Sequence, residues 1–160
     1  MKKILVISDT HGSTKGIEKL LPLIAENDYV IHLGDGANDM REVSAKYPEK
    51  VFVCAGNCDF FSSHPEEGVL EAEWLRVFYC HGHRYGVKSG LGVLAIEAKR
   101  QGCDVALYGH THQALISEIN GVLLINPGTL RRAVDEGGSY CYLVINKDKA
   151  TPVIVGDTYQ

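Results

Sequence analysis

Short apolar runs alternate with longer amphipathic segments over the first two thirds of the chain. Apolar runs occur at residues 2–8 (KKILVIS), 29–34 (YVIHLG) and 50–56 (KVFVCAG), and one or two more lie within residues 68–83. A short apolar run that is bounded by polar residues or glycine is typical of a buried strand. We therefore predict strands at these positions and a further strand at residues 104–110 (DVALYGH).

The segments between these runs have the spacing of helices. Within residues 13–27, apolar side chains recur at helical intervals, with Ser13 as the expected N-cap and Pro22 as a flaw that shortens or kinks the helix. Residues 38–48 predict a short helix that is capped by Asn38 or Asp39 and ends at a proline. Residues 86–101 predict a third helix, which ends at the following glycine.

The last third of the chain has a different pattern. Two β-rich runs are joined by Asn120-Gly121, the strongest short signal for a hairpin. A second hairpin is expected from residues 139–145 and 151–155, around a polar turn. Because βαβ units come first and antiparallel strands last, we expect one α/β domain over residues 1–160, with enough strands for two sheets.

Composition narrows the class of protein. The chain has 160 residues, 45% of them hydrophobic, and no apolar run reaches the roughly 18 residues that span a bilayer. The apolar run at residues 4–7 is too short for a signal peptide, so we expect a cytoplasmic protein without a membrane partner. The net charge of −4 and the lack of a basic cluster argue against tight nucleic-acid binding.

Metal-binding residue types follow five of the predicted strands. Each strand ends in a small or polar residue and then in Asp, His or Asn, in the segments SDTH (8–11), LGDG (33–36), AGNCD (55–59), YCHGH (79–83) and YGHTH (108–112). Ligands of open α/β sheets bind beyond the carboxyl ends of strands, so we expect these five tips to meet at one edge. A lone DxH or GD carries little information, but five such endings in one chain are hard to attribute to chance. His32, His64 and His83 keep their ordinary interpretation as strand, loop or cleft-lining residues.

The spacing of these residues suggests how they share ions. Residues i and i+2 of an extended chain point to the same side, so Asp9 can act with His11, and His110 with His112. Mixed oxygen and imidazole donors suit manganese first, and also Zn, Fe, Co or Ni, better than Ca. Seven candidate ligands call for two divalent ions rather than one: Asp9, His11, Asp35, Asn57, His81, His110 and His112.

The order DxH, GD, GN, HG and GHTH resembles the calcineurin-like metallophosphoesterase superfamily. The short chain and the NPGT at residues 126–129 resemble its small YfcE-like phosphodiesterase branch. This resemblance implies an α/β fold, a four-layer αββα sandwich of two mixed β-sheets flanked by helices. It also implies that Asp9, His11, Asp35 and His112 hold one ion, and that Asp35, Asn57, His81 and His110 hold the other.

The expected reaction is hydrolysis of a small phosphodiester by a hydroxide that bridges the two metals. Asn57 would fill a coordination position without adding negative charge, and the alternative is an Asx turn at a strand end. Asp59 is expected to support the site from behind its ligands. Thr129 is a further residue that could line the cleft, whereas Arg131 and Arg132 are more often surface charge.

Cys58 departs from the superfamily pattern, in which a histidine follows the asparagine of GN. A neutral thiol is a poor acid for an alkoxide leaving group. Chemistry of the cysteine-phosphatase type needs an arginine six residues after the cysteine, and none of the five cysteines has one. Adjacent side chains of an extended chain diverge, which also argues against Cys58 as a ligand beside Asn57. We therefore expect Cys58 to line the site and the enzyme to favour acidic leaving groups.

Three other functions stay open at this point. A phosphomonoesterase would use the same site, and a non-catalytic scaffold like the retromer subunit would use the same fold with degraded ligands. A DNA nuclease shares the motifs, but the acidic net charge argues against it. Substrate choice is expected to depend on loops at residues 60–67 and 83–89, and association into a homo-oligomer through a sheet edge is left open.

Overall fold

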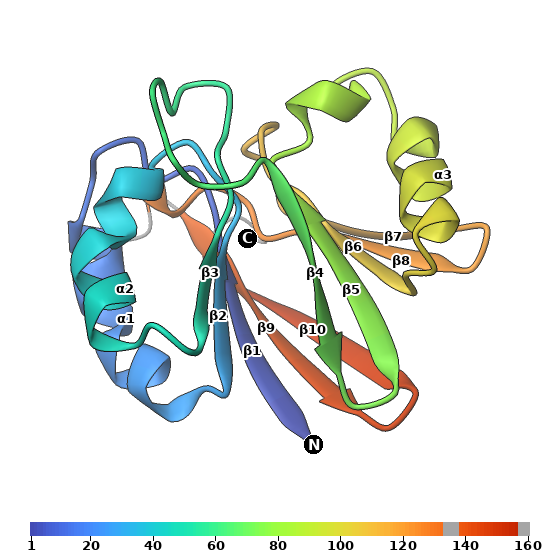
Figure 1. Cartoon of the computed structure of the whole chain (residues 1–160), viewed down its shortest axis with the longest axis horizontal. Coiled ribbons are helices and arrows are strands. Elements are labelled where there is room, and N and C mark those ends of the chain that lie inside the picture. The colour runs from blue at the N-terminus through green and yellow to red at the C-terminus, as the bar shows by residue number, and fades with distance from the viewer. Residues whose placement is uncertain (133–137, 157–160) are drawn as a thin grey trace.

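A computed structural model describes residues 1–132 and 138–156. Two five-stranded mixed sheets pack face to face, and helices cover their outer faces (Figure 1). The predicted four-layer αββα arrangement is confirmed.

The first sheet has the strand order β10-β9-β1-β2-β3. Its members are β1 (Lys2–Ile7), β2 (Tyr29–His32), β3 (Val51–Val53), β9 (Ser139–Asn146) and β10 (Lys149–Gly156). The first three strands run parallel, whereas β9 is antiparallel to both β1 and β10. The carboxyl ends of β1, β2 and β3 therefore point to the same end of the molecule.

The second sheet has the order β4-β5-β6-β8-β7. Its members are β4 (Glu67–Ala72), β5 (Leu75–Cys80), β6 (Val105–Leu107), β7 (Leu115–Ile119) and β8 (Val122–Asn126). β5, β6 and β8 are parallel, and β7 and β8 form the predicted hairpin. Asn120 and Gly121 at its turn have φ of 51° and 80°, the left-handed values that this short turn requires.

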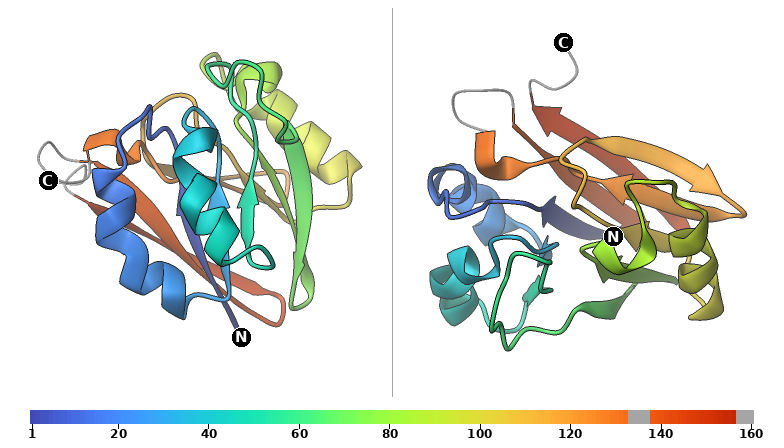
Figure 2. Two further views of the ribbon diagram at one scale, coloured as in Figure 1. Left: turned by 60° about the vertical axis from the view of Figure 1, so that its left-hand side comes forward. Right: turned by 90° about the horizontal axis from the view of Figure 1, so that it is seen from above.

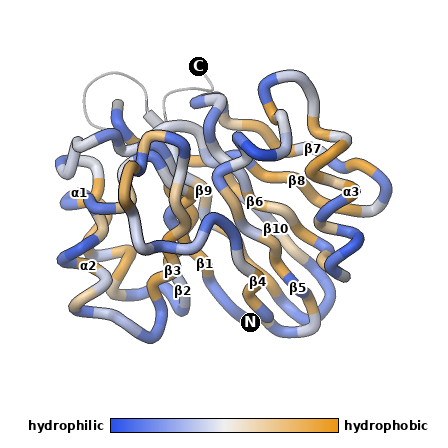
Figure 3. The backbone as a smooth tube through the Cα atoms, turned by 45° about the horizontal axis from the view of Figure 1, so that its top comes forward, coloured by the Kyte–Doolittle hydropathy of each residue, from blue (hydrophilic) through white to orange (hydrophobic). Residues whose placement is uncertain are grey.

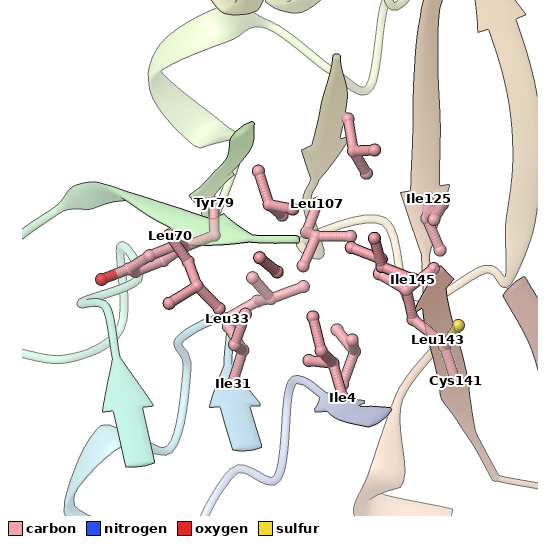
Figure 4. Close-up of a cluster of buried hydrophobic side chains, with 14 of the residues drawn as sticks. Ile4, Ile31, Leu33, Leu70, Tyr79, Leu107, Ile125, Cys141, Leu143 and Ile145 are labelled. Carbon is pink, nitrogen blue, oxygen red and sulfur yellow. The ribbon is translucent and has the colours of Figure 1, made fainter. Parts of the chain in front are cut away.

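The main core fills the space between the two sheets (Figure 4). Ile4 and Ile31 of the first sheet face Leu107 and Ile125 of the second, and all four are fully buried. Hydrophobic backbone positions concentrate in the strands, and hydrophilic ones in many of the outer turns (Figure 3). Because burial of apolar area is the main favourable term in folding, this core fixes how the two sheets face each other.

Two smaller cores attach the helices. α1 (Lys15–Glu26), η1 (Ala37–Met40) and α2 (Arg41–Lys46) cover the first sheet, and α3 (Gly92–Arg100) covers the second (Figure 2). Two further single turns are η2 (His83–Tyr85) and η3 (Leu130–Arg132). Among the residues the structure describes, no helix has both the length and the apolar character that crossing a membrane requires.

Two predicted helix caps are wrong. The cap position of α1 is Thr14 rather than Ser13, and no side chain there caps the helix. The second helical segment begins at Ala37 with Gly36 at its cap position, so neither Asn38 nor Asp39 is its cap. The carboxylate of Asp39 instead accepts hydrogen bonds from Thr10 and Gly12, because tertiary partners compete with the local cap.

The predicted helix at residues 86–101 is too long. Only Gly92–Arg100 is α-helical. Gly86 and Gly90 have φ of 61° and 143°, values that no right-handed helix can contain. Residues 86–91 therefore form a loop at the end of the molecule to which β5 and β6 point (Figure 1).

Candidate metal centre

The carboxyl ends of β1, β2 and β3 point toward the upper side of the molecule in Figure 1. Metal-binding side chains that follow strands of both sheets come together at the strand ends. Asp9, His11 and Asp35 follow strands of the first sheet, and His81, His110 and His112 follow strands of the second. Five strand tips converge as predicted, but they come from two facing sheets rather than from the edge of one.

The first cluster consists of Asp9, His11 and His112. Oδ1 of Asp9 lies 3.2 Å from Nε2 of His112 and 3.6 Å from Nε2 of His11. The two imidazole nitrogens are 3.2 Å apart. Three donor atoms therefore point toward one another, as the ligands of a shared cation do.

The second cluster consists of Asp35, His81 and His110. Nε2 of His81 lies 3.2 Å from Oδ2 of Asp35 and 3.1 Å from Nδ1 of His110. The clusters adjoin, because Oδ2 of Asp35 is also 3.8 Å from Nε2 of His11. Asp35 thus lies between the two groups.

Left-handed backbone, not extended chain, brings these side chains together. Asp9 and His11 have φ of 56° and 45°, and His110 and His112 have φ of 71° and 63°. Strand spacing alone would let His110 and His112 face the same ion, but they lie in different clusters, which agrees with the division that the resemblance implies. Positive φ costs free energy for residues other than glycine, and such strain concentrates at functional sites.

The surroundings of His81 leave one ring nitrogen available as a ligand. Its Nδ1 lies 2.7 Å from the carbonyl oxygen of Leu33, a contact in which Nδ1–H donates and Nε2 faces Asp35. Burial lowers the pKa of His81, but hydrogen bonding to Asp35 and the charge of Asp9 outweigh it, so the pKa is raised. Burial raises the pKa of Asp35, but the hydrogen bonds from His81 and from the Cys58 amide outweigh burial. The pKa of Asp35 therefore lies well below its ordinary value.

One carboxylate oxygen shows that the donors fit a cation. Oδ2 of Asp9 accepts from the Ser8 hydroxyl at 2.5 Å and from the His110 amide at 3.1 Å. Oδ1 is buried and has no hydrogen-bond partner among the described residues, although three imidazoles surround it. A buried, unpaired carboxylate oxygen is costly, and a divalent cation would satisfy it.

Two glycines allow the loops to approach closely enough. A Cβ at Gly109 would overlap the Ser8 hydroxyl and lie 2.7 Å from Oδ2 of Asp9. A Cβ at Gly56 would overlap the Asp35 carboxylate and lie 2.6 Å from its backbone nitrogen. These two positions therefore admit no side chain without displacing an aspartate of the site.

Asp59 holds two loops together from behind the clusters. Its carboxylate accepts from the backbone amides of Asp35, Gly36, Ala37 and Gly56, at distances of 2.7 to 3.0 Å. Burial raises its pKa, but these four amides outweigh burial and lower it. This geometry agrees with the supporting position expected for Asp59.

Asn57 and Cys58 are exposed and lie in a turn after β3. The thiol of Cys58 lies within 4.8 Å of ligand atoms of His11 and Asp35. The extended-chain reason for keeping Cys58 away from the ligands is therefore wrong, because the chain has already turned. The amide nitrogen of Asn57 lies 3.6 Å from that sulfur, and its role as a metal ligand stays a prediction.

Sequence reasoning missed a buried hydrogen-bonded chain that joins the Asp9 and Asp35 loops. Nδ1 of His32 accepts from the Gly34 amide at 3.0 Å, so Nε2–H donates to the Thr10 hydroxyl, also at 3.0 Å. Thr10 in turn donates to Asp39 at 2.6 Å. A histidine in an otherwise apolar strand was the available signal, since a buried polar side chain requires partners.

Three weaker candidates can also be placed. The hydroxyl of Thr129 donates to the Asp9 carbonyl at 2.7 Å and is buried, so Thr129 positions the loop and does not line a cleft. Arg131 is exposed, and the side chain of Arg132 lies outside the described residues. The His83 ring centroid lies 5.4 Å from that of His81, beside the second cluster.

Comparisons with known proteins agree with this geometry. The family model described as calcineurin-like phosphoesterase superfamily domain matches residues 1–148. A probable metallophosphoesterase of Bacillus subtilis, YsnB, is 35% identical over 152 residues, covering 92% of this chain and 87% of that protein. The phosphodiesterase YfcE of Escherichia coli is 27% identical, covering 98% of this chain and 94% of that protein.

A solved structure is similar over nearly the same length. Vps29 of Chaetomium thermophilum has a TM-score of 0.82 and 20% identity, covering 98% of this chain and 86% of that one. At this identity the likeness supports the fold alone.

Proposed function

Because the chain belongs to the calcineurin-like phosphoesterase superfamily, we propose that it is a phosphodiesterase that uses two divalent cations. It is a metal-dependent phosphoric ester hydrolase, and the preference for diesters, the two-ion count and the metal are the parts proposed. Manganese is the proposed first choice of metal.

The observation that carries the proposal is the pair of adjoining donor clusters. Asp9, His11 and His112 would hold one ion, and Asp35, His81 and His110 the other, with Asp35 between them. Asn57 is proposed to complete the second set.

Two bound cations would polarise the phosphoryl group and supply hydroxide for in-line attack at neutral pH. The chain contributes two negative charges, from Asp9 and Asp35, against the four positive charges of two divalent ions. The site therefore stays cationic and attracts an anionic diester although the whole chain carries −4.

Cys58 limits which leaving groups are tolerated. In the metal-free chain, burial and the neighbouring Asp35 raise the pKa of its thiol, which favours the neutral form. A neutral thiol neither holds a phosphate by charge nor protonates an alkoxide well. We expect faster turnover of aryl than of alkyl diesters and little loss in Cys58→Ala. Equal rates on both classes, together with inactivity of Cys58→Ala, would refute this role.

The test is hydrolysis of bis(4-nitrophenyl) phosphate by metal-free protein before and after addition of Mn²⁺, with bound metal measured in parallel. We expect about two ions per chain and activity that depends on them. Asp35→Asn should lose at least a hundredfold in rate, whereas Asp148→Asn, on an exposed turn, should keep it. The proposal would be overturned if wild type bound no added metal and stayed inactive, or if Asp35→Asn kept the activity of wild type.

The second candidate is a non-catalytic scaffold of the same fold, and the two intact donor clusters argue against it. A phosphomonoesterase is the nearer alternative. Comparing the rates of hydrolysis of 4-nitrophenyl phosphate and of bis(4-nitrophenyl) phosphate distinguishes it from a phosphodiesterase. A folded protein that binds no metal and hydrolyses neither ester would favour the scaffold.

A further inference from the structure

A cleft opens beside the second donor cluster and has no part in holding the metals. The loop at residues 86–91 forms one wall, and the segment after His110 forms the other. Its volume is about 460 Å³, which lies within the range of small-molecule sites. The residues that line it are Val87, Lys88, Gly90, Leu91, Tyr108, Thr111, Gln113, Ala114 and Leu115.

We propose that this cleft binds the ester group of the substrate that is not the leaving group, and that Lys88 pairs with a second anionic substituent on that group. The inference rests on the proposed phosphodiesterase function. It adds the class of substrate: a diester of moderate size that carries a negative charge besides the one on its scissile phosphate.

The cleft lies next to the candidate metal centre, although none of the candidate metal ligands lines it. Thr111 lines it and lies between His110 and His112, one from each donor cluster. Val87 and Tyr108 line it as well and lie beside Gly82, which directly follows His81. A diester whose phosphorus lies at the two clusters therefore has room for one ester arm in this cleft.

Charge favours an anionic arm. Of the described residues that line the cleft, Lys88 alone carries a charge, and no carboxylate is among them. Lys88 is exposed, and it forms no ion pair with a described residue. Lys88 lines the cleft together with Thr111, the residue between His110 and His112. An ammonium group so placed attracts an anion near the metals.

The remaining walls suit the organic part of the ester. Leu91, Ala114 and Leu115 are apolar and partly exposed. Thr111 supplies a directed donor: its oxygen accepts from the side chain of Asn126 at 2.9 Å and from the amide of Gln113 at 3.2 Å. With both lone pairs used, the hydroxyl proton is free to donate to a ligand.

The test uses a matched pair of substrates with one leaving group. These are the 4-nitrophenyl ester of thymidine 5′-phosphate and the same ester carrying a 3′-phosphate. We expect Mn-loaded wild type to show a KM about tenfold lower for the 3′-phosphorylated ester. Lys88→Met should remove that difference, and Lys19→Met, which replaces an exposed lysine on α1, should leave it unchanged.

A binding measurement separates this inference from the proposed function. Calorimetry should show that thymidine 3′,5′-bisphosphate binds wild type about tenfold more tightly than thymidine 5′-monophosphate, and that Lys88→Met binds both alike. If wild type hydrolyses neither ester but keeps this Lys88-dependent difference, the phosphodiesterase proposal fails and the cleft assignment stands. If wild type hydrolyses both esters with equal KM, or Lys88→Met changes KM for both by the same factor, the cleft assignment is wrong.

Discussion

His32 shows how one buried side chain can fix two loops of the site. It is fully buried, and its two ring nitrogens bond to residues of different loops, Thr10 and Gly34. Burial lowers its pKa to about 4. The charges of Asp9, Asp59 and Asp39 act to raise this pKa, and the charge of His81 acts to lower it. The imidazole is therefore neutral at pH 7, with a single tautomer set by its partners.

This pKa predicts how stability depends on pH. Below about pH 6.5 the unfolded chain takes up a proton at His32 and the native chain does not, so the free energy of unfolding falls as pH falls toward 4. Each pH unit in this range lowers the free energy of unfolding by about 1.4 kcal/mol, which amounts to about 2 kcal/mol between pH 6.5 and 5. In urea unfolding of metal-free protein, His32→Gln should lose this part of the pH dependence. Parallel profiles for the two proteins would contradict the assignment.

Asp59 should matter for stability and for metal binding together. Asp59→Asn replaces a carboxylate oxygen, which accepts hydrogen bonds from backbone amides, by an NH₂ group, which cannot accept them. We expect a loss of about 2 kcal/mol in unfolding free energy, typical of hydrogen bonds to a charged group. Because the freed loop carries Asp35, Mn²⁺ affinity should fall about tenfold. Asp148→Asn is the control for removing one exposed carboxylate. An unchanged Mn²⁺ affinity in Asp59→Asn would contradict the prediction.

At the scale of elements, α1 tolerates a residue that its pattern marked as a flaw. Pro22 lies inside the helix on its exposed side and removes one backbone hydrogen bond. The helix continues to Glu26 because Ile17, Leu20 and Ile24 remain buried against the first sheet. Tertiary packing thus outweighs local propensity here.

Replacing that proline should stabilise the protein. Pro22→Ala restores an N–H donor and a good helix former at an exposed position, so we expect a gain of about 1–3 kcal/mol. Thermal unfolding followed by circular dichroism measures the gain. Lys19→Ala, at an exposed position in the same helix, should change stability by less than about 0.5 kcal/mol. A destabilised Pro22→Ala would show that the ring makes packing contacts that matter more than the lost hydrogen bond.

At the scale of the whole molecule, the pattern of apolar runs sufficed to predict the strands, both hairpins and the meeting of the candidate ligands at the strand ends. It could not predict the loop at residues 86–91, because the choice between helix and loop at Gly86 and Gly90 depends on backbone conformation. Strand alternation alone could not predict how the donors divide between the clusters, since left-handed turns direct His110 and His112; the family resemblance implied that division.

Metal binding should stabilise the whole chain, because donors from both sheets meet only in the folded state. At a free Mn²⁺ concentration a hundred times the dissociation constant, the linked gain is about 2.7 kcal/mol, or roughly 5–10 °C in Tm. Differential scanning fluorimetry with and without EDTA measures it. Asp35→Asn should show a clearly smaller rise, and an equal rise in that variant would mean that the ion binds elsewhere.

The division of the donors between two sheets has a consequence during synthesis. The last donor, His112, is made late, and β9, which pairs with β1 beside Asp9, is made later still. A nascent chain on the ribosome therefore exposes aspartates and histidines one group at a time without a finished site for any of them. We expect the ion to be captured only after the chain has folded, so the metal gained reflects the ions available to released protein.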